Sequence, residues 1–148
     1  MLLRWGDKLF ADSPDFDPMK QTPETQLKQF GYNNDYVGFI PLDGADDHAL
    51  LAVNHEYTNP ELMFPGLATV GKDDEGKDKV IIGEMGKDLV DIEMAAHGGT
   101  IVEIRKDENG KWQPVLDGKY NRRIHVGTEM ELTGPAAGHD SLKTNADA

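Results

Sequence analysis

Three consecutive polar residues, Asn54, His55 and Glu56, are the densest group of potential ligands in the sequence. Amide and carboxylate oxygens suit calcium, and an imidazole nitrogen suits iron or zinc. The three residues are therefore candidate metal ligands. Adjacent side chains point to opposite faces while a strand continues, which works against a shared ligand sphere. The alternative is that Asn54 ends a strand in an Asx turn, with His55 and Glu56 on opposite faces.

Two consecutive arginines, Arg122 and Arg123, form the second candidate site. A guanidinium fork binds phosphate or carboxylate oxygens with paired hydrogen bonds, so both arginines are candidates for substrate binding. The alternative is that each arginine pairs with a surface carboxylate of this acidic chain. The sequence identifies no catalytic residue, and the absence of cysteine excludes a thiol nucleophile, a zinc-thiolate site and a disulfide framework.

The charge and length limit the classes of function. The chain has 148 residues and a formal net charge of −12, which argues against binding of nucleic acid by a positively charged surface. Its apolar runs fall far short of the ~20 residues that span a bilayer, and its first residues lack the pattern of a signal peptide. Mean hydropathy is −0.56, with 16 glycines and 8 prolines, which indicates a loop-rich domain of ordinary size.

Two hairpins and one helix are expected to position these residues. Apolar runs at 36–40 and 49–53, separated by turn residues, predict the first hairpin. Residues 100–105 and 111–115 flank an Asn-Gly dipeptide and predict the second. Between them, apolar residues recur at three and four positions over residues 78–97, which predicts an inserted amphipathic helix weakened by Gly83 and Gly86.

The predicted fold is mainly β, with three regions. Residues 1–35 form an irregular N-terminal segment, residues 36–132 carry the strands and the helical insertion, and residues 133–148 form a connector. Propeller blades are four-stranded, so two hairpins supply about one blade. The chain is therefore expected to be the N-terminal blade region of a β-propeller.

Seven strings, taken in order along the chain, resemble the N-terminal part of the PhoX-type bacterial alkaline phosphatases. They are residues 3–7 (LRWGD), 30–35 (FGYNND), 53–58 (VNHEYT), 94–99 (MAAHGG), 102–105 (VEIR), 120–124 (YNRRI) and 133–139 (TGPAAGH). The resemblance extends over nearly the whole chain, so it is more specific than any single motif.

The resemblance implies a phosphomonoesterase built on a β-propeller, with a centre of iron and calcium and with phosphate esters as substrates. It implies export by the twin-arginine route, and hence a periplasmic or secreted protein. Family members are several times longer, and their next stretch carries an iron-binding cysteine and calcium-binding acidic residues. The chain is thus expected to be a fragment that is inactive alone and has the rest of the propeller as its partner. The alternative is a non-catalytic propeller segment.

Overall fold

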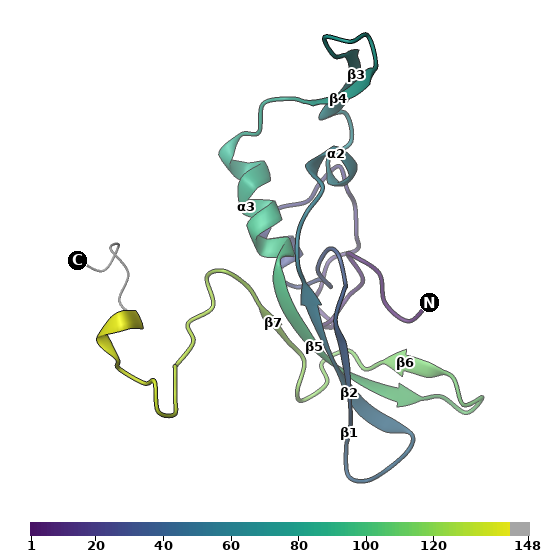
Figure 1. The fold of residues 1–148 in the computed structure, drawn as a ribbon. Helices are drawn as coiled ribbons and strands as arrows, with labels where there is room; N and C mark the ends of the chain where they lie inside the picture. The colour runs from purple at the N-terminus through teal and green to yellow at the C-terminus, as the bar shows by residue number, and fades with distance from the viewer. Residues whose placement is uncertain (143–148) are drawn as a thin grey trace.

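The computed structural model of the chain describes residues 1–142, and one antiparallel sheet organises most of them (Figure 1). The order of its strands is β1-β2-β5-β6, and β7 pairs with β5 beside β6. The bounds are Val37–Pro41 for β1, His48–His55 for β2, Gly98–Lys106 for β5, Trp112–Pro114 for β6 and Arg122–Ile124 for β7.

Both predicted hairpins are confirmed. β1 and β2 pair antiparallel, with Val37 opposite Val53. β5 and β6 pair antiparallel with Lys106 opposite Trp112, and the turn between them contains Gly110 at φ +75°, a conformation that favours glycine. β2 and β5 lie side by side along eight residue pairs, so the two hairpins join into one sheet.

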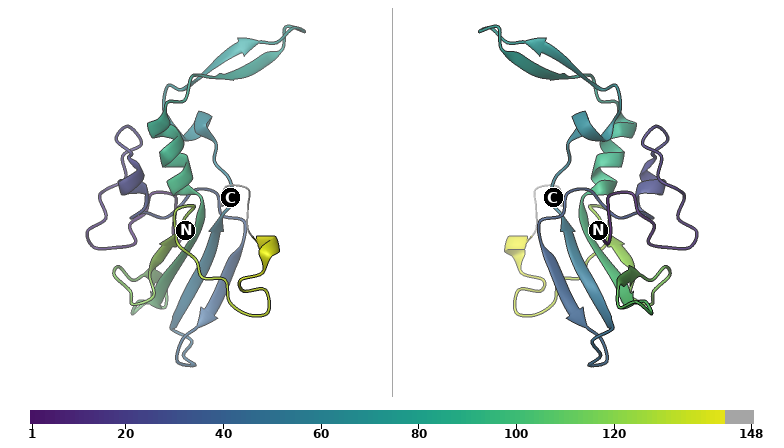
Figure 2. Two further views of the ribbon diagram at one scale, coloured as in Figure 1. Left: turned by 90° about the vertical axis from the view of Figure 1, so that its left-hand side faces the viewer. Right: turned by 90° about the vertical axis from the view of Figure 1, so that its right-hand side faces the viewer.

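The predicted helix over residues 78–97 is wrong in its first half. Residues Asp78–Ile82 form strand β4, which pairs with β3 (Ala68–Lys72) in a separate two-stranded arm. The helix α3 covers only Lys87–Ala96. The physical reason is that β-branched residues favour extended chain, and the glycines at 83 and 86 interrupt a helix that would join the two segments. The arm projects away from the body (Figure 2).

Three further helical turns are short. They are α1 (Pro23–Gln26), α2 (Pro60–Met63) and the 3-10 helix η1 (Asp140–Leu142). The Thr22 hydroxyl accepts a hydrogen bond from the Thr25 N–H at 3.2 Å, which caps α1. Residues 125–139 contain no helix or strand, and the chain runs there away from the sheet (Figure 1). The last part of the predicted connector, residues 143–148, lies outside the described residues.

One face of the sheet, the core face, is covered by the N-terminal segment. Side chains alternate along a strand, so the buried residues of β2 and β5 meet this segment on one side. Together they form a core of six buried apolar residues: Leu9, Phe30, Ala49, Val53, Val102 and Ile104. A second cluster joins α2 to α3 through Met63, Phe64, Ile92 and Ala96. The N-terminal segment is thus irregular in secondary structure yet firmly packed.

The predicted mainly β class is confirmed, whereas a propeller blade is not. Among the described residues the strands form an open five-stranded sheet and a two-stranded arm, with no closed ring of blades. Within the same part of the chain, no helix has both the length and the apolar character needed to cross a bilayer.

Candidate functional site

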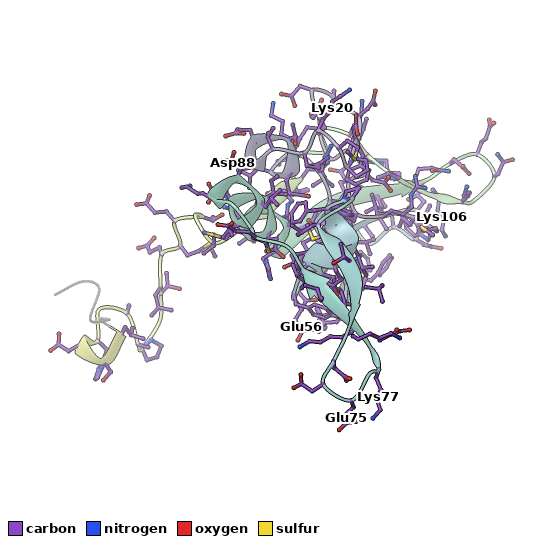
Figure 3. The ribbon with its side chains drawn as sticks, turned by 90° about the horizontal axis from the view of Figure 1, so that it is seen from above. Lys20, Glu56, Glu75, Lys77, Asp88 and Lys106 are labelled. Carbon is purple, nitrogen blue, oxygen red and sulfur yellow. The ribbon has the colours of Figure 1, made fainter. Side chains whose placement is uncertain are left out.

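The side chains of the three predicted metal ligands point in different directions. Asn54 accepts a hydrogen bond at Oδ1 from the Tyr36 N–H at 2.7 Å, whereas His55 is buried in the core face. Glu56 follows the last residue of β2 and is exposed, away from the tip of the arm where Glu75 and Lys77 lie (Figure 3). The described residues contain no cluster of three histidine, aspartate or glutamate side chains arranged to hold a metal.

His55 is held as a neutral imidazole. Its exposed fraction is 2%, and its Nε2 lies 2.7 Å from Oγ1 of Thr100. Burial and then the charge of Arg123 lower the pKa of His55 to about 3, while the nearby backbone of Tyr32 and Asn33 acts weakly in the opposite direction. Nδ1 is buried with no hydrogen-bond partner of normal geometry.

The motif at residues 30–31 packs directly on this imidazole. The Phe30 ring meets the His55 ring edge to face with centroids 4.9 Å apart. A Cβ atom on Gly31 would come within 2.5 Å of the same ring and within 2.6 Å of the Ala96 carbonyl oxygen. Only glycine fits there, so the FGYNND string positions the N-terminal segment against the end of β2 and the end of α3.

Arg123 joins three elements through its guanidinium. Nη2 donates to the carbonyl of Ala95 at 2.6 Å and to that of His97 at 3.2 Å, at the C-terminal end of α3. Nη1 donates to the Gly99 carbonyl at 2.8 Å and to the Thr100 hydroxyl at 3.2 Å in β5. Burial lowers the pKa of Arg123 to about 10, so the cation persists at neutral pH and faces the negative end of the helix dipole.

Thr100 therefore links the two sites predicted from the sequence. Because its hydroxyl oxygen accepts from Arg123, we assign its proton to a hydrogen bond with His55 Nε2, which leaves the His55 proton on Nδ1. No carboxylate forms an ion pair with either arginine among the described residues. The alternative, that each arginine pairs with a surface carboxylate, is therefore not met among the described residues, where both arginines donate to backbone carbonyls instead.

Arg122, the other arginine, is exposed. Its Nε donates to the Tyr120 carbonyl at 3.2 Å, and the rest of its fork makes no hydrogen bond with the described residues. In the register of β5 and β7 it lies opposite Ile101, one residue from Arg123 and hence on the opposite face of the sheet. The two guanidiniums consequently do not form a joint phosphate site.

A buried pair that sequence reasoning missed lies at the other end of β2. His48 Nε2 and Glu103 Oε1 are 2.7 Å apart, and both side chains are almost fully buried. Asp43 and Arg105 approach this pair at 3.6 Å and 3.5 Å. His48 and Glu103 are 55 residues apart, so only the pairing of β2 with β5 brings them together. Glu103 lies within a predicted strand, but His48 falls in the turn before the predicted strand at 49–53, so no local signal joined the two residues.

Asn121, in the YNRRI string, is a second residue with a role that the sequence did not reveal. Its Nδ2 donates to the carbonyls of Leu9 and Val115, at 2.9 and 2.7 Å, and its Oδ1 accepts from the Glu103 N–H at 2.7 Å. The side chain thus fastens the N-terminal segment to β5. Several strings that suggested chemistry therefore hold the fold together.

Comparison with known proteins identifies the class of protein to which the chain belongs. The family model described as "Alkaline phosphatase PhoX" matches residues 1–148. A solved structure, Pseudomonas fluorescens PhoX in complex with vanadate, a transition state analogue, is similar with a TM-score of 0.76 and 35% sequence identity. The similarity covers 99% of this chain and 23% of that one. A search of curated proteins finds no match.

The class that the match defines is the alkaline phosphatases, enzymes that hydrolyse phosphate monoesters. Within it, the chain belongs to the PhoX family. The predicted resemblance is confirmed. The chain spans less than a quarter of the length of the PhoX structure that it matches.

Proposed function

We propose that these 148 residues form the N-terminal part of a metal-dependent phosphomonoesterase of the PhoX type. The observation that carries this proposal is the family match over residues 1–148, and the 35% identity to a PhoX that binds vanadate supports it. Vanadate imitates the transferring phosphoryl group, so its presence in the relative agrees with chemistry at phosphorus.

In this proposal the parent enzyme uses calcium and iron, and Glu56 supplies one carboxylate to that centre. Of the three predicted ligands, Glu56 alone combines exposure with a side chain that bonds to no other described residue. Asn54 and His55 are engaged with Tyr36 and Thr100, so they fit the role of fixing the end of β2. The cations, when bound, would neutralise phosphate oxygens and polarise phosphorus.

Arg122 is the arginine that we assign to substrate. Its fork is exposed and largely unengaged, whereas Arg123 would have to give up hydrogen bonds to four acceptors before it could meet a phosphate. A guanidinium suits the paired oxygens of a phosphate ester. Arg122 therefore binds and orients the ester in this scheme, and Arg123 stabilises the strands that carry it.

The fold and location of the parent are part of the proposal. The open sheet supplies strands to a β-propeller completed by further chain, which is the partner of this segment. The parent acts in the periplasm or outside the cell, where phosphate esters are its substrates. Membership of the PhoX family and the open sheet are the observations that support the shared propeller, and the location is proposed with the family.

A hybrid enzyme tests the proposal. Residues 1–148 replace the matching part of Pseudomonas fluorescens PhoX, and hydrolysis of an aryl phosphate is measured across a calcium titration. We expect vanadate-sensitive activity, and we expect Glu56→Gln to raise the calcium concentration needed for half activity by ~10-fold or more. Glu84→Gln, at another exposed glutamate, is the matched control and should leave the titration unchanged.

Two results would contradict the proposal. A hybrid that unfolds cooperatively yet hydrolyses nothing would instead favour a non-catalytic propeller segment. A Glu56→Gln titration superimposable on that of the unsubstituted hybrid would remove Glu56 from the metal centre while leaving the family function intact.

A further inference from the structure

The turns that join β3 to β4 and β5 to β6 are built alike. They are residues 73–77 (DDEGK) and 107–111 (DENGK). In both, the N–H of the first residue donates to the carbonyl of the fifth at 2.9 Å, and the glycine N–H donates to the carbonyl of the first. In both, Oδ1 of the first aspartate also accepts from the N–H groups of the third and fifth residues. The two turns therefore share one backbone arrangement and differ at the third residue, which is Glu75 in one and Asn109 in the other.

The third residue decides which turn can react. Asparagine is a thermolabile residue, and the backbone nitrogen that follows it can close a five-membered ring on its side-chain carbonyl carbon. At Gly110 no side chain shields that nitrogen, and a Cβ added there would meet no atom within 4 Å. The Asn109 side chain makes no hydrogen bond with residues 1–142. Glu75 has no amino group to lose, and its carboxylate accepts from Lys77 Nζ at 2.7 Å.

The reaction at Asn109 needs only water and hydroxide. Hydroxide removes the proton of the Gly110 nitrogen, which forms a bond to Cγ of Asn109. The Cγ–Nδ2 bond breaks, and ammonia leaves with a proton from water, which restores the hydroxide. Water then opens the ring at either carbonyl and leaves aspartate or isoaspartate at position 109. The net change is the exchange of ammonia for water, with no oxidation or reduction.

We propose that Asn109 is a deamidation site and that the Asp107 carboxylate sets its rate. The attack requires the Gly110 N–H to leave the Asp107 carbonyl, at 2.9 Å, and the backbone of Asn109 to rotate. The bonds from Asp107 Oδ1 to the N–H groups of residues 109 and 111 oppose that rotation, and Gln113 Nε2 holds Oδ2 at 3.0 Å. Reacting atoms held away from attack geometry react more slowly. These groups all lie within the turn and β6, so the inference is independent of the proposed phosphatase function.

The two products affect the hairpin differently. Aspartate adds a negative charge and keeps the backbone of the turn, as the acidic Glu75 does in the matching turn. Isoaspartate adds a carbon to the main chain, so the two backbone bonds that close the turn lose their register. Trp112 follows this turn, and its ring meets that of Phe39 edge to face with centroids 5.6 Å apart. Isoaspartate is therefore expected to loosen the contact between β6 and β1.

The experiment incubates the folded 148-residue chain at neutral pH and follows two tryptic peptides by mass spectrometry. Trypsin cuts after lysine and so releases residues 73–77 and 107–111 from the same sample. We expect the product, heavier by the difference between a hydroxyl and an amino group, to accumulate in peptide 107–111 and not in peptide 73–77. Asp107→Ala should accelerate the reaction by ~10-fold. Asp73→Ala is the matched control and should leave peptide 107–111 unchanged. Glu75→Asn should introduce the reaction in peptide 73–77.

Denatured samples separate the effect of the turn from that of the neighbouring carboxylate. In guanidinium chloride the wild-type chain and Asp107→Ala should react at the same rate, because the hydrogen bonds of the turn are lost in both. A folded wild-type chain that stays unmodified while the denatured chain converts overturns the proposed site. Equal rates for folded wild type and folded Asp107→Ala overturn the role of Asp107. If Asp107→Ala has no cooperative melt, Gln113→Ala replaces it and should raise the rate by ~2-fold or more.

Discussion

Arg123, Thr100 and His55 form a buried polar chain in which most partners are backbone carbonyls and hydroxyls. Within residues 1–142 no carboxylate pairs with the Arg123 guanidinium, and the C-terminal end of α3 supplies the opposing partial charge. A buried cation of this kind stabilises the fold only while its acceptors remain in place. The two adjacent arginines therefore have different roles, and a matched pair of substitutions can separate them.

We expect Arg123→Met to lower the free energy of unfolding by ~3 kcal/mol, because it leaves buried carbonyls at the α3–β5 junction unsatisfied. Arg122→Met, at an exposed fork, should change it by less than ~0.5 kcal/mol. Urea unfolding of the two variants measures the difference. Equal midpoints for both would show that the Arg123 contacts contribute nothing to stability.

The lowered pKa of His55 predicts a loss of stability in acid. The pKa of His55 is about 3 in the folded state and 6.5 ordinarily. Below pH 6.5, therefore, His55 binds a proton in the unfolded chain but stays unprotonated in the folded chain until the pH approaches 3. The contribution of neutral His55 to the free energy of unfolding is fully present above pH 6.5 and is lost as the pH falls toward 3. At pH 5 the loss is about 2 kcal/mol. Urea unfolding at pH 7 and pH 5 measures it.

Two substitutions test the assignment of this pH dependence. His55→Gln should flatten the fall in unfolding free energy between pH 7 and pH 5, whereas His139→Gln, at an exposed histidine, should leave it unchanged. An unaltered slope in His55→Gln would assign the acid sensitivity to other groups.

At the scale of elements, the turn from α3 into β5 fixes where the polar chain lies. His97 ends the helix with its Nδ1 2.7 Å from the Glu93 carbonyl oxygen, and Gly98 then adopts φ +103°. A Cβ at Gly98 would lie 2.1 Å from the Ile124 carbonyl oxygen of β7. The close approach of β7, which carries both arginines, therefore depends on this glycine.

We expect Gly98→Ala to lower the free energy of unfolding by ~3 kcal/mol or more, since both the backbone conformation and the collision with β7 oppose a methyl group. Gly110→Ala is the control: its φ is also positive, at +75°, but no atom lies within 4 Å of the added Cβ. That substitution should cost only ~1 kcal/mol. Thermal unfolding compares them, and equal losses would exclude the steric explanation.

The β3–β4 arm is expected to be dispensable for the fold of the body. Strand β4 is exposed throughout and β3 is exposed except at Ala68 and Gly71, which are half-buried. The ends of the arm meet where the Gly83 N–H donates to the Leu67 carbonyl at 2.8 Å. Replacing residues 68–82 by a two-residue Gly-Ser link should change the unfolding free energy of the body by less than ~1 kcal/mol. Loss of the cooperative transition would show that the arm supports the body.

At the scale of the whole molecule, the chain carries few of the groups that phosphoryl chemistry requires. No cluster of three potential metal ligands occurs in the described residues, and the PhoX structure that it matches is more than four times as long as the shared part. The matched segment therefore supplies a scaffold and single residues, Glu56 and Arg122, to a centre that further chain completes in our proposal.

We accordingly expect the isolated 148-residue chain to show no hydrolysis of an aryl phosphate above a buffer blank, with calcium, iron or both added. The carboxylate of Glu56 and the guanidinium of Arg122 are too few to hold the metal ions and the substrate that a metal-assisted displacement at phosphorus requires. Activity that persists through rigorous purification and disappears with a chelator would contradict this expectation.

The sequence alone determined the family, the mainly β class and both hairpins of the sheet. Local rules suffice for these features: apolar runs bounded by turn residues define hairpins, and ordered strings define a family. The helix over residues 78–97 was half wrong because apolar residues spaced at three and four positions also fit a β-branched strand followed by a break at Gly83 and Gly86.

Only the tertiary structure decided what the candidate residues do. Three adjacent residues look like one site, yet a strand sends Asn54 and His55 to opposite faces and leaves Glu56 beyond the end of β2. Arg122 and Arg123 are divided by the same alternation. The pairs His55–Thr100 and His48–Glu103 span 45 and 55 residues, and strand pairing, which local sequence does not specify, creates them.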